Sequence, residues 1–319
     1  MNSLAIWHES NHDEQAQLDL HFNHWKLCKS DNTLSYFLDI GIKVVSTVEL
    51  GEICLFLPFT ISKADHYLID LGEKLKEKQL STAIFNEDYG ADTSIVGKGF
   101  LLKEGSNSKY YVYCLAVEND LTYENRYGGT IIKFKHQLHI DLPTYYRFRV
   151  IAPDIGHFSN EYKPNNSFLE SAFSSVEIID FRVNDRRNLD ISLVEHITSQ
   201  KQFQIKLIHY FVMRSIDDEY ILSNKDLDSL RLLEKDIWSA YIDGGSYKYQ
   251  KSIAYHLKEK IGNDESGTGI SDFIALLKFR FPDRNIKKYL LYVTAFALLT
   301  GLLVASVYDS LKSFFTCFI

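Results

Sequence analysis

Apolar and polar residues alternate with the two-residue period of a β-strand through much of the first part of the chain. Leu18, Leu20 and Phe22 are separated by polar residues, so they fall on one face of an extended segment. Further strand signals occur at residues 37–45, 53–59, 94–102, 110–117, 130–140, 145–151 and 176–183. We therefore predict a β-rich domain over residues 1–190, with mostly antiparallel connections.

After about residue 190 the apolar spacing changes to that of α-helices. Leu230, Leu233, Ile237 and Tyr241 recur every three to four residues and form an amphipathic stripe. Similar patterns predict helices over residues 68–80, 192–213, 227–241, 249–261 and 271–282. The fold class predicted from these patterns is α+β, with a helical region over residues 191–281 that holds an oligomer together.

An uncharged apolar segment, residues 289–307, lies near the end of the chain. It reads YLLYVTAFALLTGLLVASV. Its roughly 19 residues, at about 1.5 Å each, nearly span a hydrocarbon layer of about 30 Å. Helices in the core of a soluble protein are rarely apolar on every face. We therefore predict a single transmembrane helix within a C-terminal part formed by residues 282–319.

The charges beside this segment predict its orientation. The basic residues that precede it form a collar: Lys278, Arg280, Arg284, Lys287 and Lys288. After it, the tail carries Lys312 and Asp309. Positive charge stays on the cytoplasmic side of a membrane, and the first residues of the chain do not resemble a secretory signal. We expect a single-pass protein of the inner (plasma) membrane with its N-terminal domain in the cytoplasm.

The apolar segment also has a face of small residues. Ala297, Gly301 and Ala305 follow one another at intervals of four positions. Small residues let helix backbones approach closely in lipid, whereas a lone anchor needs no such face. Thr294 and Thr300 add hydroxyls that can face a narrow pore or bond back to their own helix. We predict that these residues mediate self-association into a homo-oligomer such as a tetramer.

Composition and cysteine usage limit the chemistry. The net charge is −7, so the average surface repels nucleic acid and a polyanion needs a local basic patch. The four cysteines lie far apart without a C-x-x-C pair, which argues against a disulfide framework or a zinc ribbon.

One zinc-peptidase motif occurs, H-E-x-x-H, formed by His8, Glu9 and His12. It lies at the terminus without the apolar helix that normally surrounds such a motif, and no third ligand can be named. We expect a solvated segment there. Because glycine-rich stretches near residues 243 and 267 also lack the strand-then-helix setting of a phosphate loop, we predict no catalytic residue, no metal site and no cofactor.

Basic residues alternate with aromatic ones on predicted strands. Side chains two positions apart share one face of a strand. Guanidinium and ammonium groups bind phosphates, and aromatic rings stack on bases. The candidates for a nucleotide-binding groove are Lys133, Lys135, Tyr145, Arg147, Arg149, Arg186 and Arg187. The alternative is an ordinary solvated sheet face with paired charges.

The order of parts resembles that of bacterial anti-phage membrane effectors: a β-rich sensor, a helical region, a basic collar at 278–288 and a span at 289–307. In this class a cytosolic sensor reads a nucleotide or oligonucleotide signal and controls transmembrane helices that permeabilise the inner membrane. The chain looks most similar to the channel subunit of the Hailong type. That resemblance implies an oligomeric ion channel controlled by single-stranded DNA oligomers, with a partner protein from the same operon. It includes no diagnostic motif, so it assigns no functional residue.

Our main hypothesis is therefore a ligand-controlled, homo-oligomeric membrane effector in anti-phage defence. Two other classes stay open, a tail-anchored enzyme such as a hydrolase or nuclease, and a membrane-tethered scaffold. A discrete oligomer in mild detergent favours a pore, because one helix cannot enclose one. A monomer favours an anchor.

Overall fold

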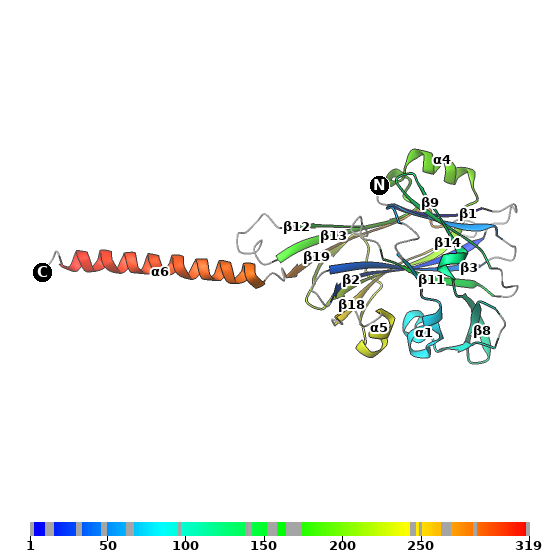
Figure 1. The fold of residues 1–319 in the computed structure, drawn as a ribbon, viewed down its shortest axis with the longest axis horizontal. Helices are drawn as coiled ribbons and strands as arrows, with labels where there is room; N and C mark the ends of the chain where they lie inside the picture. Colours follow the sequence, from blue (N-terminus) through cyan, green and yellow to red (C-terminus); the bar gives the residue numbers. More distant parts are fainter. Residues whose placement is uncertain are drawn as a thin grey trace. The chain divides into compact units, whose positions relative to one another are not determined.

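The computed structural model of the chain forms two compact units, one made of Met1–Asn160 with Ile178–Phe279 and one made of Glu161–Glu177 with Arg280–Ile319. The first unit is built from stacked β-sheets (Figure 1). The structure describes residues 3–9, 16–29, 34–45, 50–61, 67–94, 97–137, 139, 142–151, 158–163, 174–242, 247–248, 251–262, 269–282 and 286–316.

The smaller sheet has eight strands and is mixed. Its order is β15–β19–β13–β1–β4–β10–β9, and β12 pairs with β13 outside this path. β1 runs parallel to β13 and antiparallel to β4, and β10 is antiparallel to both β4 and β9. The strands are β1 (Ser3–Glu9), β4 (Glu52–Leu57), β9 (Leu121–Arg126), β10 (Gly129–Lys135), β12 (Ser159–Tyr162), β13 (Ser174–Val183), β15 (Glu219–Ser223) and β19 (Phe273–Pro282).

The larger sheet has eleven strands and is also mixed. Its order is β16–β18–β14–β2–β3–β11–β8–β7–β6, and β17 and β5 add to β2 and β11. β14 runs parallel to β2, and β11 parallel to β8. The strands are β2 (Gln17–Lys29), β3 (Leu34–Val45), β5 (Leu68–Asp70), β6 (Tyr89–Asp92), β7 (Gly99–Glu104), β8 (Asn107–Tyr113), β11 (Thr144–Val150), β14 (Gln204–Ser215), β16 (Ser229–Leu232), β17 (Tyr247–Lys248) and β18 (Ser252–Lys260).

The main hydrophobic core lies between the two sheets. Phe181 of the smaller sheet stacks on Tyr210 of the larger one, with ring centroids 4.3 Å apart. Leu18, Leu20 and Phe22 all point into this core, as their alternation predicts. Burying each such side chain contributes about 1.5–3 kcal/mol. The β-rich architecture predicted for the first part of the chain is confirmed, although the sheets mix parallel with antiparallel pairs.

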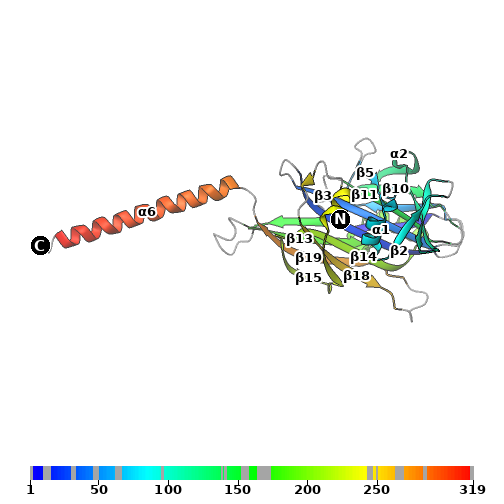
Figure 2. The same ribbon diagram turned by 90° about the horizontal axis from the view of Figure 1, so that it is seen from below.

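Short helices cover the outer faces of the sandwich (Figures 1 and 2). α4 (Ile191–Ser199) begins after Asp190, whose carboxylate accepts a hydrogen bond from the Ser192 amide at 2.9 Å and caps the helix. It packs on the smaller sheet through Leu193 and Ile197. α1 (Lys78–Phe85) and α5 (Lys235–Ile242) lie against the larger sheet. The described residues also include the helical turns η2 (Glu73–Lys76), α2 (Val117–Asp120) and η4 (Arg186–Asn188).

The helical region predicted over residues 191–281 is wrong, because its described residues form six strands and only two short helices, α4 and α5. β14, β18 and β19 occupy most of the predicted helices, and β16 occupies part of another. In β14 the pairing with β2 shifts register between Ile205 and Leu207. The shift breaks the two-residue alternation, so apolar positions about four residues apart imitated a helix. These strands join both sheets, so the segment is part of the same sandwich.

The short helix predicted over residues 68–80 is also corrected. The chain forms β5, then η2, and then the first turn of α1 in this stretch. Leu71, Leu75 and Leu80 are buried there, so the apolar pattern reported burial correctly but not the backbone conformation.

α6 (Ile286–Thr316) is a single long helix, and none of its residues Leu290–Ser313 is buried; the most apolar 18-residue window of this stretch has a mean hydropathy of 2.2. These 24 residues extend about 36 Å, which is long enough to cross a hydrocarbon layer of about 30 Å. The apolar helix predicted from the sequence is therefore present, and it begins and ends close to the predicted positions.

Candidate functional site

A cleft of about 670 Å³ opens on the outer face of the larger sheet. Its walls include outward-facing residues of β2, β14 and β18, the end of α1 and the first turn of α5. It is called the histidine cleft below, after His21, His209 and His256, which line it together with Arg147 and Trp238. Its volume lies in the range of small-molecule sites.

The histidines of the cleft come from neighbouring strands. His21 on β2 and His209 on β14 are directly paired in the parallel register, with ring centroids 4.9 Å apart. His256 on β18 stacks beside His209, and Nδ1 of His209 lies 2.8 Å from Nε2 of His256, a hydrogen bond. The strand pairing thus lines up three imidazoles across the sheet.

Burial keeps these imidazoles neutral near pH 7. Burial, reinforced by His256, lowers the pKa of His209 to about 4. Burial, then His209 and Arg147, hold the pKa of His21 well below its usual value. The pKa of His256 is also lowered by burial. The cleft therefore holds a row of uncharged bases that an additional negative charge would make easier to protonate.

Ser229 and Asp228 lie at the open end of this row. The Ser229 hydroxyl lies 3.2 Å from Nδ1 of His256, and the Asp228 carboxylate lies 3.1 Å from the same nitrogen. A Ser-His-Asp triad needs the serine and the carboxylate on opposite ring nitrogens. Here Nε2 of His256 is occupied by His209, so the arrangement does not build an activated serine.

A hydrogen-bonded chain connects the histidines to the floor of the cleft. Nη1 of Arg147 donates to the Tyr145 hydroxyl at 2.9 Å, and that hydroxyl lies 3.3 Å from Nδ1 of His21. Nε of Arg147 donates to the Tyr241 hydroxyl at 2.9 Å. Gly41 on β3 leaves room for this chain, because a Cβ at that position would overlap the Tyr145 hydroxyl.

Below Arg147 lies a buried ion pair. Arg149 donates to Asp39 through two nitrogens, at 2.6 and 3.1 Å. Asp39 also accepts from the Tyr241 hydroxyl and from the Trp25 indole, both at 2.8 Å. Tyr241 comes from α5, so that short helix closes the network and covers it from solvent.

Aromatic rings form much of the remaining wall. Phe211 stacks on His256 with centroids 4.1 Å apart, and Phe85 of α1 stacks on Tyr110 at 5.5 Å. Trp238 contributes from α5. The cleft therefore combines flat apolar surfaces with basic groups, which is the composition expected of a site for a small organic ligand.

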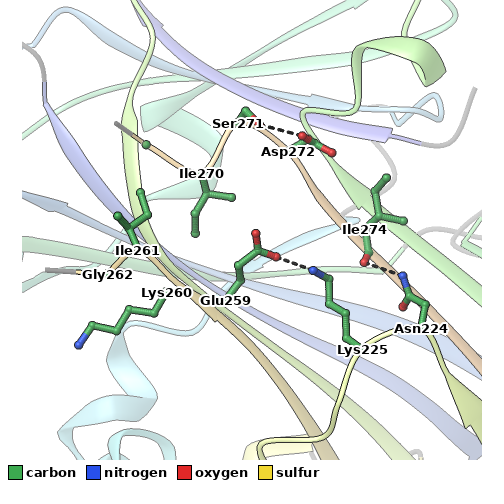
Figure 3. Close-up of a pocket in the computed structure, with 11 residues that line it drawn as sticks. Asn224, Lys225, Glu259, Lys260, Ile261, Gly262, Ile270, Ser271, Asp272 and Ile274 are labelled. Carbon is green, nitrogen blue, oxygen red and sulfur yellow. Dashed lines mark hydrogen bonds and ion pairs between the residues drawn. The ribbon is translucent and has the colours of Figure 1, made fainter. Parts of the chain in front are cut away.

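A second hollow, of about 600 Å³, lies between the segment before β16, the end of β18 and the start of β19. Figure 3 shows Lys225 and Glu259 pointing toward each other across it, joined by an ion pair of 2.6 Å. Asn224 donates to the Ile274 carbonyl at 3.2 Å. Because Lys225 and Glu259 pair with each other and the lining is mostly polar, this hollow is the weaker candidate.

The structure does not bring the predicted groove residues together. Phe134 of β10 and Tyr146 of β11 meet inside the sandwich, with centroids 5.0 Å apart. Their strand neighbours Lys133 and Arg147 therefore point to opposite outer faces. The single groove predicted from these strands is thus wrong.

Each of the predicted basic residues has its own surroundings. Lys133 pairs with Glu9 at 3.0 Å, and Lys135 is exposed. Arg147, Arg149 and Tyr145 are buried on the larger sheet. Arg186 and Arg187 lie in η4 at the smaller sheet, where Arg187 pairs with Asp185 at 3.1 Å.

The first two residues of the H-E-x-x-H segment, His8 and Glu9, end the strand β1, so the solvated segment expected there is wrong for His8. His8 lies on β1, is buried, and packs on Phe203 with centroids 4.6 Å apart. Glu9 pairs with Lys133, and His12 lies outside the described residues. Among the residues that the structure describes, no cluster of three His, Cys, Asp or Glu side chains is arranged to hold a metal.

The predicted helix-contact residues, Thr294, Ala297, Thr300, Gly301 and Ala305, all lie on the apolar helix α6. The Thr300 hydroxyl donates to the Phe296 carbonyl at 3.0 Å, so in the single chain it bonds back to its own helix. Beyond the backbone of its own helix, a Cβ added at Gly301 would meet nothing within 4 Å. Their roles in helix contact and pore lining stay predictions.

Sequence reasoning missed the residues that define the cleft. Asp19, His21 and Asn23 alternate with the apolar residues of β2, which is a signal that they share an outward face. His209 and His256 gave no such signal, because their segments were predicted as helices. Comparison with known proteins adds no assignment, since no protein-family model and no curated protein matches the chain.

Proposed function

We propose that the protein is a ligand-controlled membrane effector, a homo-oligomeric ion channel or membrane-permeabilising protein of bacterial anti-phage defence. Its β-sandwich lies in the cytoplasm and α6 crosses the inner membrane. The observation that carries the proposal is the presence, in one chain, of a ligand-sized cleft and a long apolar helix in which no residue from Leu290 to Ser313 is buried. A helix of that composition needs lipid or other helices around it.

Self-association follows from the physics of a single span. One helix cannot enclose a pore, so several copies related by symmetry must supply the wall. The small residues Ala297, Gly301 and Ala305 let these copies approach closely. A nucleotide or oligonucleotide that binds one arrangement of the oligomer more tightly shifts the equilibrium of the gate.

The histidine cleft takes over the role first given to the basic strand groove. Arg147 remains a candidate for ligand contact, because it lines the cleft, and the buried Tyr145 supports it by accepting a hydrogen bond from Arg147. Lys133 and Lys135 lie on a strand of the other sheet, and Arg186 and Arg187 lie in η4, so none of the four lines this cleft. An oligonucleotide could place only a terminal nucleotide in a cleft of about 670 Å³.

The experiment uses the full-length protein purified in mild detergent and then reconstituted in liposomes. Light scattering gives the oligomer mass, and dye or ion efflux is followed with ATP or short single-stranded DNA added. We expect a discrete oligomer and an efflux that changes with one of these ligands. A monomer whose liposomes stay sealed under every condition would instead favour a tail-anchored enzyme or a scaffold.

A further inference from the structure

We propose that the histidine cleft binds a small organic anion, a phosphate or carboxylate group beside a flat ring, and that its histidines take up protons as the anion binds. The inference rests on the proposed function, since it names the chemistry of the ligand that such a protein requires. Binding itself is nevertheless measurable without a membrane.

The first argument is a charge imbalance under the cleft. Two buried guanidinium groups, Arg147 and Arg149, lie near one buried carboxylate, Asp39. Arg149 takes both Asp39 oxygens in a bidentate pair. Among the described residues, no carboxylate forms an ion pair with Arg147, which is only 1% exposed. The cluster of Arg147, Arg149 and Asp39 therefore carries one positive charge that no carboxylate contacts.

The partners that Arg147 does have are neutral. They are the hydroxyls of Tyr145 and Tyr241, each at 2.9 Å. When the Asn23 amide is oriented with its oxygen toward the guanidinium, Nη2 of Arg147 donates to it at 2.5 Å. Burying an ion whose charge no partner neutralises costs several kcal/mol. The burial of Arg147 beside an open cleft is explained if an anion that enters the cleft forms an ion pair with its guanidinium.

Other charged groups around the cleft are already matched. Lys43 pairs with Asp19, and Arg231 pairs with Glu234 at 2.9 Å. Asp228 contacts both His256 and Lys258. Glu87 lines the cleft as an exposed residue, where water screens its charge. The uncompensated charge is therefore that of Arg147.

The second argument concerns the proton. Tyr145 joins Arg147 to His21, so an anion beside Arg147 also lies near the histidine row. A negative charge favours the protonated form of a nearby imidazole. The groups that face the row from every adjoining element are Asp19, Lys43, Glu87, Tyr89, Tyr110, Tyr145, Arg147, Asp228, Arg231 and Lys258. The carboxylates among them already have partners or lie at the rim. The negative charge that favours protonation of the histidines therefore comes from the bound ligand.

The third argument is the flat apolar wall. Phe211 and Phe85 line the cleft from β14 and α1, and Trp238 faces it from α5. These rings come from different elements, so the fold places aromatic surface on more than one side of the polar floor. A ligand with a ring can bury that ring against them while its anionic group reaches Arg147.

A metal ion explains the histidines less well. Nδ1 of His209 and Nε2 of His256 hydrogen-bond to each other, and Nδ1 of His21 lies at the Tyr145 hydroxyl. Three imidazole nitrogens would have to leave these partners to converge on one ion. In the part of the chain that the structure describes, no such three-ligand cluster is formed.

Isothermal titration calorimetry of the full-length protein in detergent tests the proposal. The probes are AMP, benzoate and inorganic phosphate, titrated at pH 6 and pH 8 in two buffers of different ionisation enthalpy. We expect AMP or benzoate to bind at least about tenfold more tightly at pH 6, since uptake of one full proton over these two pH units corresponds to about 100-fold, with a heat that depends on the buffer. Failure of all three probes to bind at either pH, or binding without pH dependence, overturns the proposal.

Matched variants place the effect in the cleft. Arg147→Gln keeps a hydrogen-bonding group and removes the charge, so we expect a loss of affinity of at least tenfold with no loss of thermal stability. His209→Gln should reduce the pH dependence. His136→Gln is the control, because His136 is a buried histidine bonded to Tyr146 at 3.1 Å and does not line the cleft. Unchanged binding in both cleft variants would remove the proposed site.

The two proposals fail in different ways. If AMP or benzoate binds as described but liposome efflux never responds to any ligand, the binding site stands and the channel is withdrawn. If efflux responds to a nucleotide in the Arg147→Gln variant as in the unmodified protein, the channel stands and this site is wrong.

Discussion

Arg149 donates hydrogen bonds to the Asp39 carboxylate through Nε and Nη2, at 2.6 and 3.1 Å, and both side chains are at least 97% buried. Removing one partner of a buried pair leaves an uncompensated charge and costs about 3–5 kcal/mol. Loss of the Asp39 charge would leave two buried guanidinium groups without a nearby carboxylate, because Arg147 lies beside Asp39 as well.

Asp39→Asn should therefore lower the free energy of unfolding by about 3–5 kcal/mol in urea denaturation. The matched control is Glu124→Gln, since Glu124 pairs with Arg126 at 3.5 Å on the exposed surface. Exposed pairs contribute about 0–1 kcal/mol, so this variant should be nearly neutral. An equal effect of the two substitutions would contradict the role given to the Asp39 network.

Acid should weaken the fold through His209. Its pKa is lowered from 6.5 to about 4 by burial and by His256, so between these values the unfolded chain binds more protons than the folded one. The free energy of unfolding therefore falls as pH drops through that window, by up to about 3 kcal/mol for this group, and the contribution is complete above pH 6.5.

His209→Gln cannot be protonated, so its stability should decline less than that of the unmodified protein between pH 6.5 and pH 4. Denaturant midpoints measured at several pH values in this window give the difference. Parallel curves for the two proteins would show that His209 is protonated as easily in the folded protein as in the unfolded chain.

Much of the sandwich could be predicted because one face of each early strand is buried. Leu18, Leu20 and Phe22 report this by their alternation. The later strands were predicted as helices where a register shift, as between Ile205 and Leu207, disturbs the alternation. A pattern of apolar positions reports burial, but the pairing partner decides the backbone conformation, and that partner is distant in the sequence.

The site was harder to predict for a related reason. Alternation on β11 correctly placed Tyr145, Arg147 and Arg149 on one face, yet it could not tell whether another element covers that face. Tyr241 of α5 covers it and turns a predicted surface stripe into a buried network. The histidines of the cleft meet only through strand pairing, so no local motif contains them.

Gly41 is needed for close packing in the network. A Cβ there would overlap the Tyr145 hydroxyl and press on the side chain of His21. Gly41→Ala should therefore destabilise the protein by about 1–3 kcal/mol, as overpacking does. Gly90→Ala on β6 is the control, because a Cβ at Gly90 meets no atom within 4 Å. Equal thermal midpoints for the two variants would contradict this packing.

The topology of the proposed span can be tested by proteolysis. With the basic collar on the cytoplasmic side, protease added to intact spheroplasts should leave residues 1–280 undigested. The control is protease treatment after the spheroplasts are lysed, when the protease can reach the sandwich and should cleave its surface segments. Digestion of the sandwich in intact spheroplasts would reverse the proposed orientation.

Gly301 on α6 separates a pore from a simple anchor. Beyond the backbone of its own helix, a Cβ added there meets nothing within 4 Å, so the space beside Gly301 is open in the single helix. Gly301→Leu keeps the helix long and apolar, so membrane insertion should be unchanged. A channel needs close helix contact through Gly301, Ala297 and Ala305, and leucine adds bulk where the backbones would meet.

We therefore expect Gly301→Leu to reach the membrane, to form fewer crosslinked oligomers, and to lower the rate of ion efflux by at least about tenfold. Leu303→Ile is the matched control, because Leu303 is 65% exposed in the single helix and the substitution conserves volume. Its oligomer and efflux should match those of the unmodified protein. Full oligomerisation and efflux in both variants would mean that these helices do not meet through the small-residue face, and the anchored enzyme or scaffold would then account better for α6.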